Sequence, residues 1–134
     1  MKTKDRWKRS TSAVYNLGYH IIWCPKYRRK VLKDGVDVRL KELIQEKALF
    51  LDCEVQTLEV MPDHVHLFIK TPPTLGVHFL IQQIKGYTAH QLRNEFPWLK
   101  SRLPNMWTRS YYVESVGCVS KEGIEKYIAN QKNK

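Results

Sequence analysis

Two histidines separated by a single residue, His64 and His66, lie in the largely apolar stretch Val60–Ile69. On a β-strand, alternate side chains project from the same face, so both imidazoles would point the same way. A half-buried imidazole needs a polar partner, and one divalent cation can satisfy two neutral rings together. The pair therefore predicts a chelating site. The alternative interpretation is two surface or hydrogen-bonded histidines.

A second group of reactive side chains lies near the C-terminal end of the chain. Residues 120–132 predict a short amphipathic helix with Ser120 as its N-cap. Tyr127 and Gln131 are four residues apart, so they share one face of this helix, about one turn apart. A cation bound by the Gln131 amide oxygen would lie near whatever the Tyr127 hydroxyl attacks. The alternative is a packed tyrosine and a solvated glutamine.

Four segments, taken in order, resemble a known family, the single-tyrosine HUH transposases of hairpin-ended insertion sequences (TnpA type). The resemblance covers nearly the whole chain. Its segments are YHIIWCPKYRRKV (19–31), VMPDHVH (60–66), NMWTRSY (105–111) and YIANQ (127–131).

The resemblance implies a role for each reactive side chain. His64 and His66 would be the histidines of the HUH motif, Tyr127 the nucleophile, and Gln131 the third ligand of a divalent metal, Mg2+ or Mn2+. It also implies an activity: single-stranded DNA is cleaved and rejoined at hairpin-marked ends through a 5′-phosphotyrosine intermediate.

The chemistry of transesterification accounts for these roles independently. The reaction needs a nucleophile, a group that stabilises charge on the nonbridging phosphate oxygen, and nearly in-line geometry. A cation held by two imidazoles and an amide oxygen would polarise the phosphate and keep positions open for substrate oxygens. A phosphotyrosine diester conserves the bond energy, so a 3′-hydroxyl can attack it and rejoin DNA without ATP.

The donor set also bears on which metal binds. Two imidazoles and an amide oxygen suit manganese, whereas magnesium prefers oxygen ligands. A catalytic zinc site would ordinarily recruit a carboxylate or a third histidine or cysteine. Asp63 precedes His64 and would point to the opposite face of a strand, so we expect it to support the ligands from behind or to lie in a turn.

Positive charge dominates the composition, with 23 Lys and Arg against 13 Asp and Glu and a formal net charge of +10. This balance favours a polyanionic partner, because cationic side chains release counterions from a phosphate backbone. The alternative is a generally basic protein. In residues 26–30, four cationic side chains flank one tyrosine, which suits contacts to phosphates and to a stacked base. The alternative for this segment is a solvated loop. The predicted DNA contacts are Lys26, Tyr27, Arg28, Arg29, Lys30, Lys85 and Arg93.

Length and composition exclude other classes. The 134 residues predict a single domain over 1–134, with 1–12 as a basic arm. No apolar run approaches the roughly 20 residues of a membrane span. The three cysteines are odd in number and widely spaced, which argues against a disulfide framework and favours a reducing cytoplasm.

Hydrophobic periodicity predicts an α+β fold of the ferredoxin-like or RRM-like split βαβ type. We expect strands at 14–24, 53–61, 64–70 and 107–116, and helices at 36–51, 76–95 and 120–132. Such a fold is a four-stranded antiparallel sheet with helices on one face and the strand before each helix at its centre. The opposite face would be free for the metal and DNA to meet the final helix.

The resemblance further implies a homodimer in which the tyrosine helix of one subunit completes the metal site of the other. The short connection 114–120 contains Gly117, which could serve as a hinge. The fourth strand would be a sheet edge, and pairing of two such edges is the expected dimer contact.

Two other functional classes stay open at this point. An RRM-like module would bind nucleic acid without cutting it, and a metal-dependent nuclease would use water in place of Tyr127. Replacing Tyr127 by phenylalanine discriminates among the three, because only the transposase depends on the phenol for a covalent DNA adduct.

Overall fold

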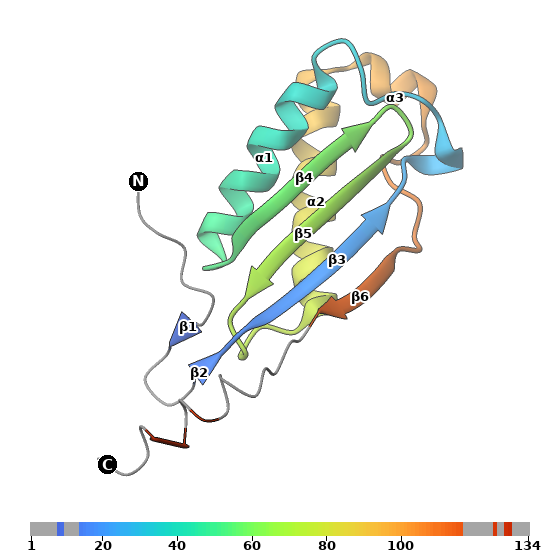
Figure 1. Ribbon diagram of the computed structural model, residues 1–134. Coiled ribbons are helices and arrows are strands. Elements are labelled where there is room, and N and C mark those ends of the chain that lie inside the picture. The colour runs from blue at the N-terminus through green and yellow to red at the C-terminus, as the bar shows by residue number, and fades with distance from the viewer. Residues whose placement is uncertain (1–7, 10–13, 117–124, 126–127, 130–134) are drawn as a thin grey trace.

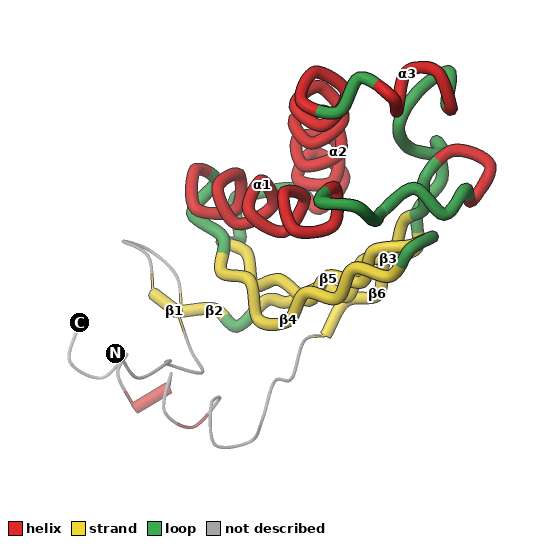
Figure 2. Tube along the Cα trace, turned by 90° about the horizontal axis from the view of Figure 1, so that it is seen from above, coloured by secondary structure: helices red, strands yellow, loops and turns green. Residues whose placement is uncertain are grey.

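Two long helices cover one face of a four-stranded antiparallel sheet in the computed structural model, which describes residues 8–9, 14–116, 125 and 128–129 (Figure 1, Figure 2). The sheet order is β4-β5-β3-β6, so the strands that precede the two long helices are the inner ones. The expected ferredoxin-like α+β arrangement is therefore confirmed. Its elements are β3 (Leu17–Trp23), α1 (Val36–Phe50), β4 (Glu54–Met61), β5 (His64–Thr71), α2 (Val77–Glu95) and β6 (Tyr112–Val116).

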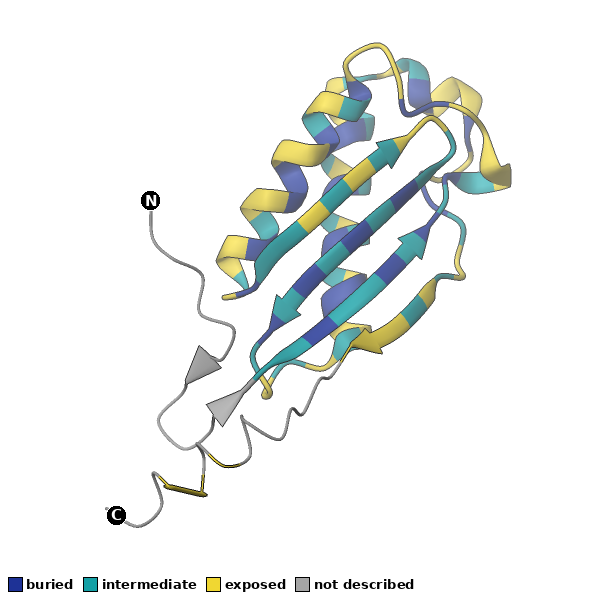
Figure 3. Cartoon of the chain, in the orientation of Figure 1, coloured by how far each residue is buried: buried dark blue, intermediate teal, exposed yellow. Residues whose placement is uncertain are grey.

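Strict alternation along the inner strands separates a core face from an open face. On β5, Val65, Leu67 and Ile69 are fully buried, whereas the residues between them are half-buried. Figure 3 shows this alternation as dark blue and teal bands along the inner strands. The buried face packs against the helices, whose core residues are Leu40, Leu43 and Ile44 on α1 and Leu80, Ile81 and Ile84 on α2.

The N-terminal part of the sheet differs from the prediction of one strand over residues 14–24. Two short strands, β1 (Lys8–Arg9) and β2 (Val14–Tyr15), pair with each other in a separate two-stranded sheet. Strand β3 begins only at Leu17. Asn16 stands between β2 and β3, and asparagine is depleted in strands because its side chain competes for backbone hydrogen bonds. Residues 8–9 of the expected basic arm thus belong to a strand.

The last strand of the sheet starts at Tyr112, later than the predicted residue 107. The backbone N–H of Thr108 donates to the Cys24 carbonyl at 3.0 Å, which ties this segment to the end of β3. Residues 107–111 therefore brace the domain instead of extending the ladder. Two short helices, η1 (Lys26–Arg28) and α3 (Trp98–Arg102), are absent from the prediction.

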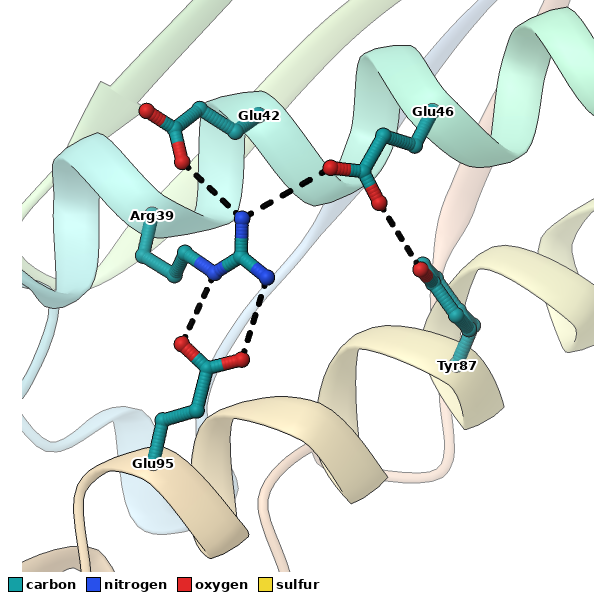
Figure 4. Close-up of polar contacts among 5 residues, drawn as sticks. All are labelled: Arg39, Glu42, Glu46, Tyr87 and Glu95. Atoms are coloured by element: carbon teal, nitrogen blue, oxygen red, sulfur yellow. Dashed lines mark hydrogen bonds and ion pairs between the residues drawn. The ribbon is translucent and has the colours of Figure 1, made fainter.

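An ionic network joins the solvent side of α1 to α2 (Figure 4). The Arg39 guanidinium donates to both carboxylate oxygens of Glu95, at 2.8 and 3.1 Å, and to Glu42 at 3.0 Å. The Tyr87 hydroxyl donates to Glu46 at 2.9 Å. The hydrogen bond to Glu95 is the main cause that raises the pKa of Arg39 above its ordinary value. This two-pronged geometry fixes the relative orientation of the helices on the side away from the sheet.

The predicted C-terminal helix lies almost entirely outside the described residues. Residues 125, 128 and 129 have helical backbone, and the rest of 120–132 stays a prediction. Within the part of the chain that is described, none of the helices has the length and apolar character needed to cross a membrane.

Thr88 provides a test of how the 107–111 segment is held. Its fully buried hydroxyl accepts the Trp107 Nε1–H at 3.1 Å. Thr88→Val keeps the shape but leaves the indole N–H unpaired, so we expect the free energy of unfolding to fall by about 1–3 kcal/mol in urea denaturation. Thr74→Val, at an exposed threonine, should change it by less than about 0.5 kcal/mol. Equal stability of both variants would contradict the role of this hydrogen bond.

Candidate functional site

The imidazoles of His64 and His66 lie on the open face of β5, away from the helices. Their side chains are 33% and 35% exposed, while Val65 between them is fully buried. The two-residue period of the strand therefore orients both rings to the same side. Because β5 is an inner strand, side chains from β4 and β3 flank the pair.

Asp63 orients the first of these histidines. It lies in the tight turn between β4 and β5, and its Oδ1 lies 2.9 Å from His64 Nδ1. Its Oδ2 accepts a hydrogen bond from Arg28 Nε at 3.1 Å. The hydrogen bond to His64, with the charge of Arg28, holds the pKa of Asp63 below its ordinary value. A carboxylate only accepts, so Nδ1 of a neutral His64 carries the proton and Nε2 keeps its lone pair for a ligand.

Glu59 stands in the corresponding position behind the second histidine. It is the cross-strand partner of His66, and its Oε1 lies 3.5 Å from His66 Nδ1. This arrangement favours the same tautomer, with the Nε2 lone pair free of a proton. Glu59 is 72% exposed and the contact is longer, so it orients its imidazole less firmly than Asp63 does.

The donor set fits a divalent cation. Metal-ligating histidines characteristically donate their other ring N–H to a carboxylate, and both rings have one in place. Among the described residues, no group of three His, Cys, Asp or Glu side chains is arranged to hold an ion. A third ligand has to come from another source, and the expected one is an amide. Three predicted functional residues lie outside the described ones: Gly117, Tyr127 and Gln131.

A third imidazole, which sequence reasoning missed, lies beside the pair. His20 is on β3, and its Nδ1 is 3.1 Å from His66 Nε2. The available signal was its place in the segment 19–31, in a strand expected next to the one that carries the histidine pair. Only the register of β3 against β5 brings the two rings together.

The basic segment 26–30 lies at the end of β3 nearest the β4–β5 turn (Figure 1). Tyr27 and Arg28 both have left-handed backbone, with φ of 59° and 52°. Such strain in non-glycine residues needs support from the surroundings, and the Arg28–Asp63 contact supplies part of it. Tyr27 is 65% exposed, and Arg29 and Lys30 are exposed beside it. This surface has the composition needed for phosphate and base contacts.

The other two predicted DNA contacts have their cationic groups engaged within the chain. Lys85 Nζ donates to the carbonyls of Thr108, Arg109 and Ser110, at 2.7, 3.3 and 3.5 Å. Burial lowers the pKa of Lys85. Arg93 Nη1 donates to the Leu103 carbonyl at 3.0 Å. Both residues hold the connection between α2 and β6, and their role as DNA contacts stays a prediction.

A ferredoxin-like sheet that carries a carboxylate-backed histidine pair on its open face is the arrangement expected of the HUH transposases. The profile of the family described as IS200-like transposases matches residues 13–131. The chain therefore belongs to the IS200-like transposases, the single-tyrosine HUH family, and it is an enzyme of that type.

Individual relatives agree with this assignment. The ISDra2 transposase TnpA of Deinococcus radiodurans is 38% identical over 129 residues, 95% of this chain and 92% of that protein. The transposase of insertion sequence element IS200 from Salmonella typhimurium is 29% identical over 119 residues, 87% of this chain and 78% of that protein.

Solved structures show the same fold. A crystal structure of a candidate transposase from Deinococcus radiodurans R1 has a TM-score of 0.77 and 37% identity, covering 92% of this chain and 97% of that one. A REP-associated tyrosine transposase bound to a REP hairpin has a TM-score of 0.58 at 16% identity, covering 94% of this chain and 73% of that one. The latter likeness concerns the fold alone.

Asp63→Asn tests whether the carboxylate orients a metal ligand. An amide can present its NH2 to His64 and favour the wrong tautomer, so we expect the dissociation constant for Mn2+ to rise about tenfold in an electron paramagnetic resonance titration. Asp52→Asn removes the same charge at an exposed position after α1 and should leave Mn2+ affinity unchanged. Equal affinities in the two variants would remove Asp63 from the site.

Proposed function

We propose that this transposase cleaves and rejoins single-stranded DNA at hairpin-marked ends by metal-assisted transesterification through Tyr127. The observation that carries the proposal is the orientation of His64 and His66. Both have a carboxylate behind Nδ1 and present Nε2 on the open face of the sheet. Membership of the IS200-like transposases supports transposition as the activity that this reaction would serve.

The proposed step forms one bond to phosphorus and breaks another. The Tyr127 oxygen attacks the scissile phosphorus and loses its proton. The bond from phosphorus to the 3′-oxygen breaks, and that oxygen takes up a proton. The 5′-phosphate stays on Tyr127, and a 3′-hydroxyl from another strand reverses the step to join DNA. A divalent cation, Mg2+ or Mn2+, bound by His64, His66 and Gln131 would polarise the phosphate.

Charge and relatives support single-stranded hairpin DNA as the partner. The net charge of +10 favours a polyanion. Exposed residues 27–30 extend this charge beside the β4–β5 turn that positions His64. A REP-associated tyrosine transposase of the same fold has been solved bound to a REP hairpin.

A homodimer and a cytoplasmic location complete the proposal. Among the described strands, β6 pairs only with β3, so its other edge is open to a second copy. The tyrosine helix of each subunit would complete the site of the other. Cys24 and Cys53 are free, as a reducing compartment requires.

Tyr127→Phe should abolish the covalent adduct that the wild-type protein forms with labelled hairpin-containing single-stranded DNA and Mg2+ or Mn2+ on a denaturing gel. A matched control exists on the open face itself. Tyr112 is 55% exposed and lies across Ile22 from His66 in the sheet. Tyr112→Phe should keep the adduct.

Each other outcome of this experiment has a definite meaning. An adduct retained in Tyr127→Phe and lost in Tyr112→Phe would move the nucleophile to β6. Cut DNA without any adduct would favour a nuclease that uses water. The wild-type protein could also bind the hairpin tightly but neither cut nor attach to a DNA that is known to contain the cleavage site. That result would indicate a binding module without catalytic activity.

Lys30→Gln tests the basic segment as a phosphate contact. Loss of one contact should weaken hairpin binding across all sequences and reduce the slope of log K against log salt concentration by about one. Lys41→Gln removes another exposed lysine, on α1, and should leave the slope as it is. A slope that falls equally in both variants would indicate a general charge effect in place of a local contact.

A further inference from the structure

The His20 imidazole lies directly against the nitrogen that the proposed metal site needs. In the ladder between β3 and β5, His20 is opposite Phe68 and Ile22 is opposite His66. His20 is therefore the diagonal neighbour of His66 on the open face. The two ring centroids are 5.3 Å apart, and Nδ1 of His20 lies 3.1 Å from Nε2 of His66.

The direction of this hydrogen bond follows from the partner on the other side of His66. A neutral imidazole has one N–H donor and one acceptor nitrogen. Glu59 faces His66 Nδ1 at 3.5 Å, and a carboxylate there needs the proton on Nδ1. Nε2 of His66 is then the acceptor, and Nδ1–H of His20 is the donor.

The surroundings hold the His20 ring in this place. It stacks on Phe68 with centroids 4.4 Å apart and planes at 14°. The Phe68 ring packs over Gly18 of β3. A larger residue at position 18 would crowd this ring, because its Cβ would be 2.9 Å from Phe68 Cε1. Stacking and backbone space therefore fix the donor before any cation arrives.

We propose that His20 is a positioning residue that occupies the Nε2 lone pair of His66, so that a divalent cation binds by displacing the His20 N–H. The inference rests on the metal site proposed above. A nitrogen lone pair cannot accept a hydrogen bond and ligate a cation together. The alternative is that His20 serves as a third ligand, and the two roles predict opposite changes of Mn2+ affinity when the His20 imidazole is removed.

The experiment measures Mn2+ affinity of the full chain by electron paramagnetic resonance. His20→Phe keeps a ring to stack on Phe68 but removes the N–H. We expect Mn2+ to bind about two- to tenfold more tightly, the equivalent of one ordinary hydrogen bond. His20→Asn retains an amide N–H near the place of Nδ1 and should return the affinity towards wild type. His90→Phe, at an exposed histidine on α2, is the matched control.

A second measurement does not depend on any variant. Long-range 1H–15N spectra of the wild-type protein without metal should show a protonated His20 Nδ1 and an unprotonated His66 Nε2. Addition of Mg2+ should shift both resonances. A protonated His66 Nε2 in the metal-free protein would overturn the proposal.

The outcomes separate this inference from the proposed function. Mn2+ binding that is unchanged or weaker in His20→Phe overturns the displacement while leaving the metal site standing. Failure of the wild-type protein to bind Mn2+ at all, with or without hairpin DNA, overturns the metal site and this inference together.

Discussion

Val65, Leu67 and Ile69 are fully buried beneath the helices, and the alternation that buries them is what turns His64 and His66 outward. A slip of β5 by one residue would reverse every side chain on the strand. It would expose three aliphatic side chains worth about 1.5–3 kcal/mol each, and it would bury two imidazoles that need polar partners. The core therefore specifies the register, and the register places the histidine pair on the open face.

The same constraint divides the molecule into two chemically different sides. The helix side is closed by apolar packing and by an ionic network around Arg39. The sheet side carries polar side chains that pair across strands, such as the exposed Glu59 with the half-buried His66. The basic side chains also fall into two groups: Lys85 and Arg93 bind backbone carbonyls, whereas Arg29 and Lys30 are exposed. Net charge alone thus overstates how many basic residues are available to a polyanion.

Local patterns carry enough information to predict the fold class and the shared face of the histidine pair. Period-two alternation identifies β5, and helical spacing identifies α1 and α2. The failures are of two kinds. Asn16 is a local cause, because it divides the segment 14–24 that was predicted as one strand. The second failure is not local: residues 107–111 leave the ladder because Trp107 and Thr108 bind α2 and the end of β3. Such tertiary contacts override local propensity and leave no mark in a sequence window.

His20 was missed for a related reason: its contact with His66 spans 46 residues and depends on register alone. The two histidines of the pair also differ in support. Asp63 is only 23% exposed and is itself held by Arg28, whereas Glu59 is 72% exposed. His64 is thus oriented by a carboxylate that Arg28 holds, and His66 by a more exposed and more distant one. His66 therefore has contacts at both ring nitrogens, Glu59 at Nδ1 and His20 at Nε2, and the register of β3 against β5 supplies the second of them.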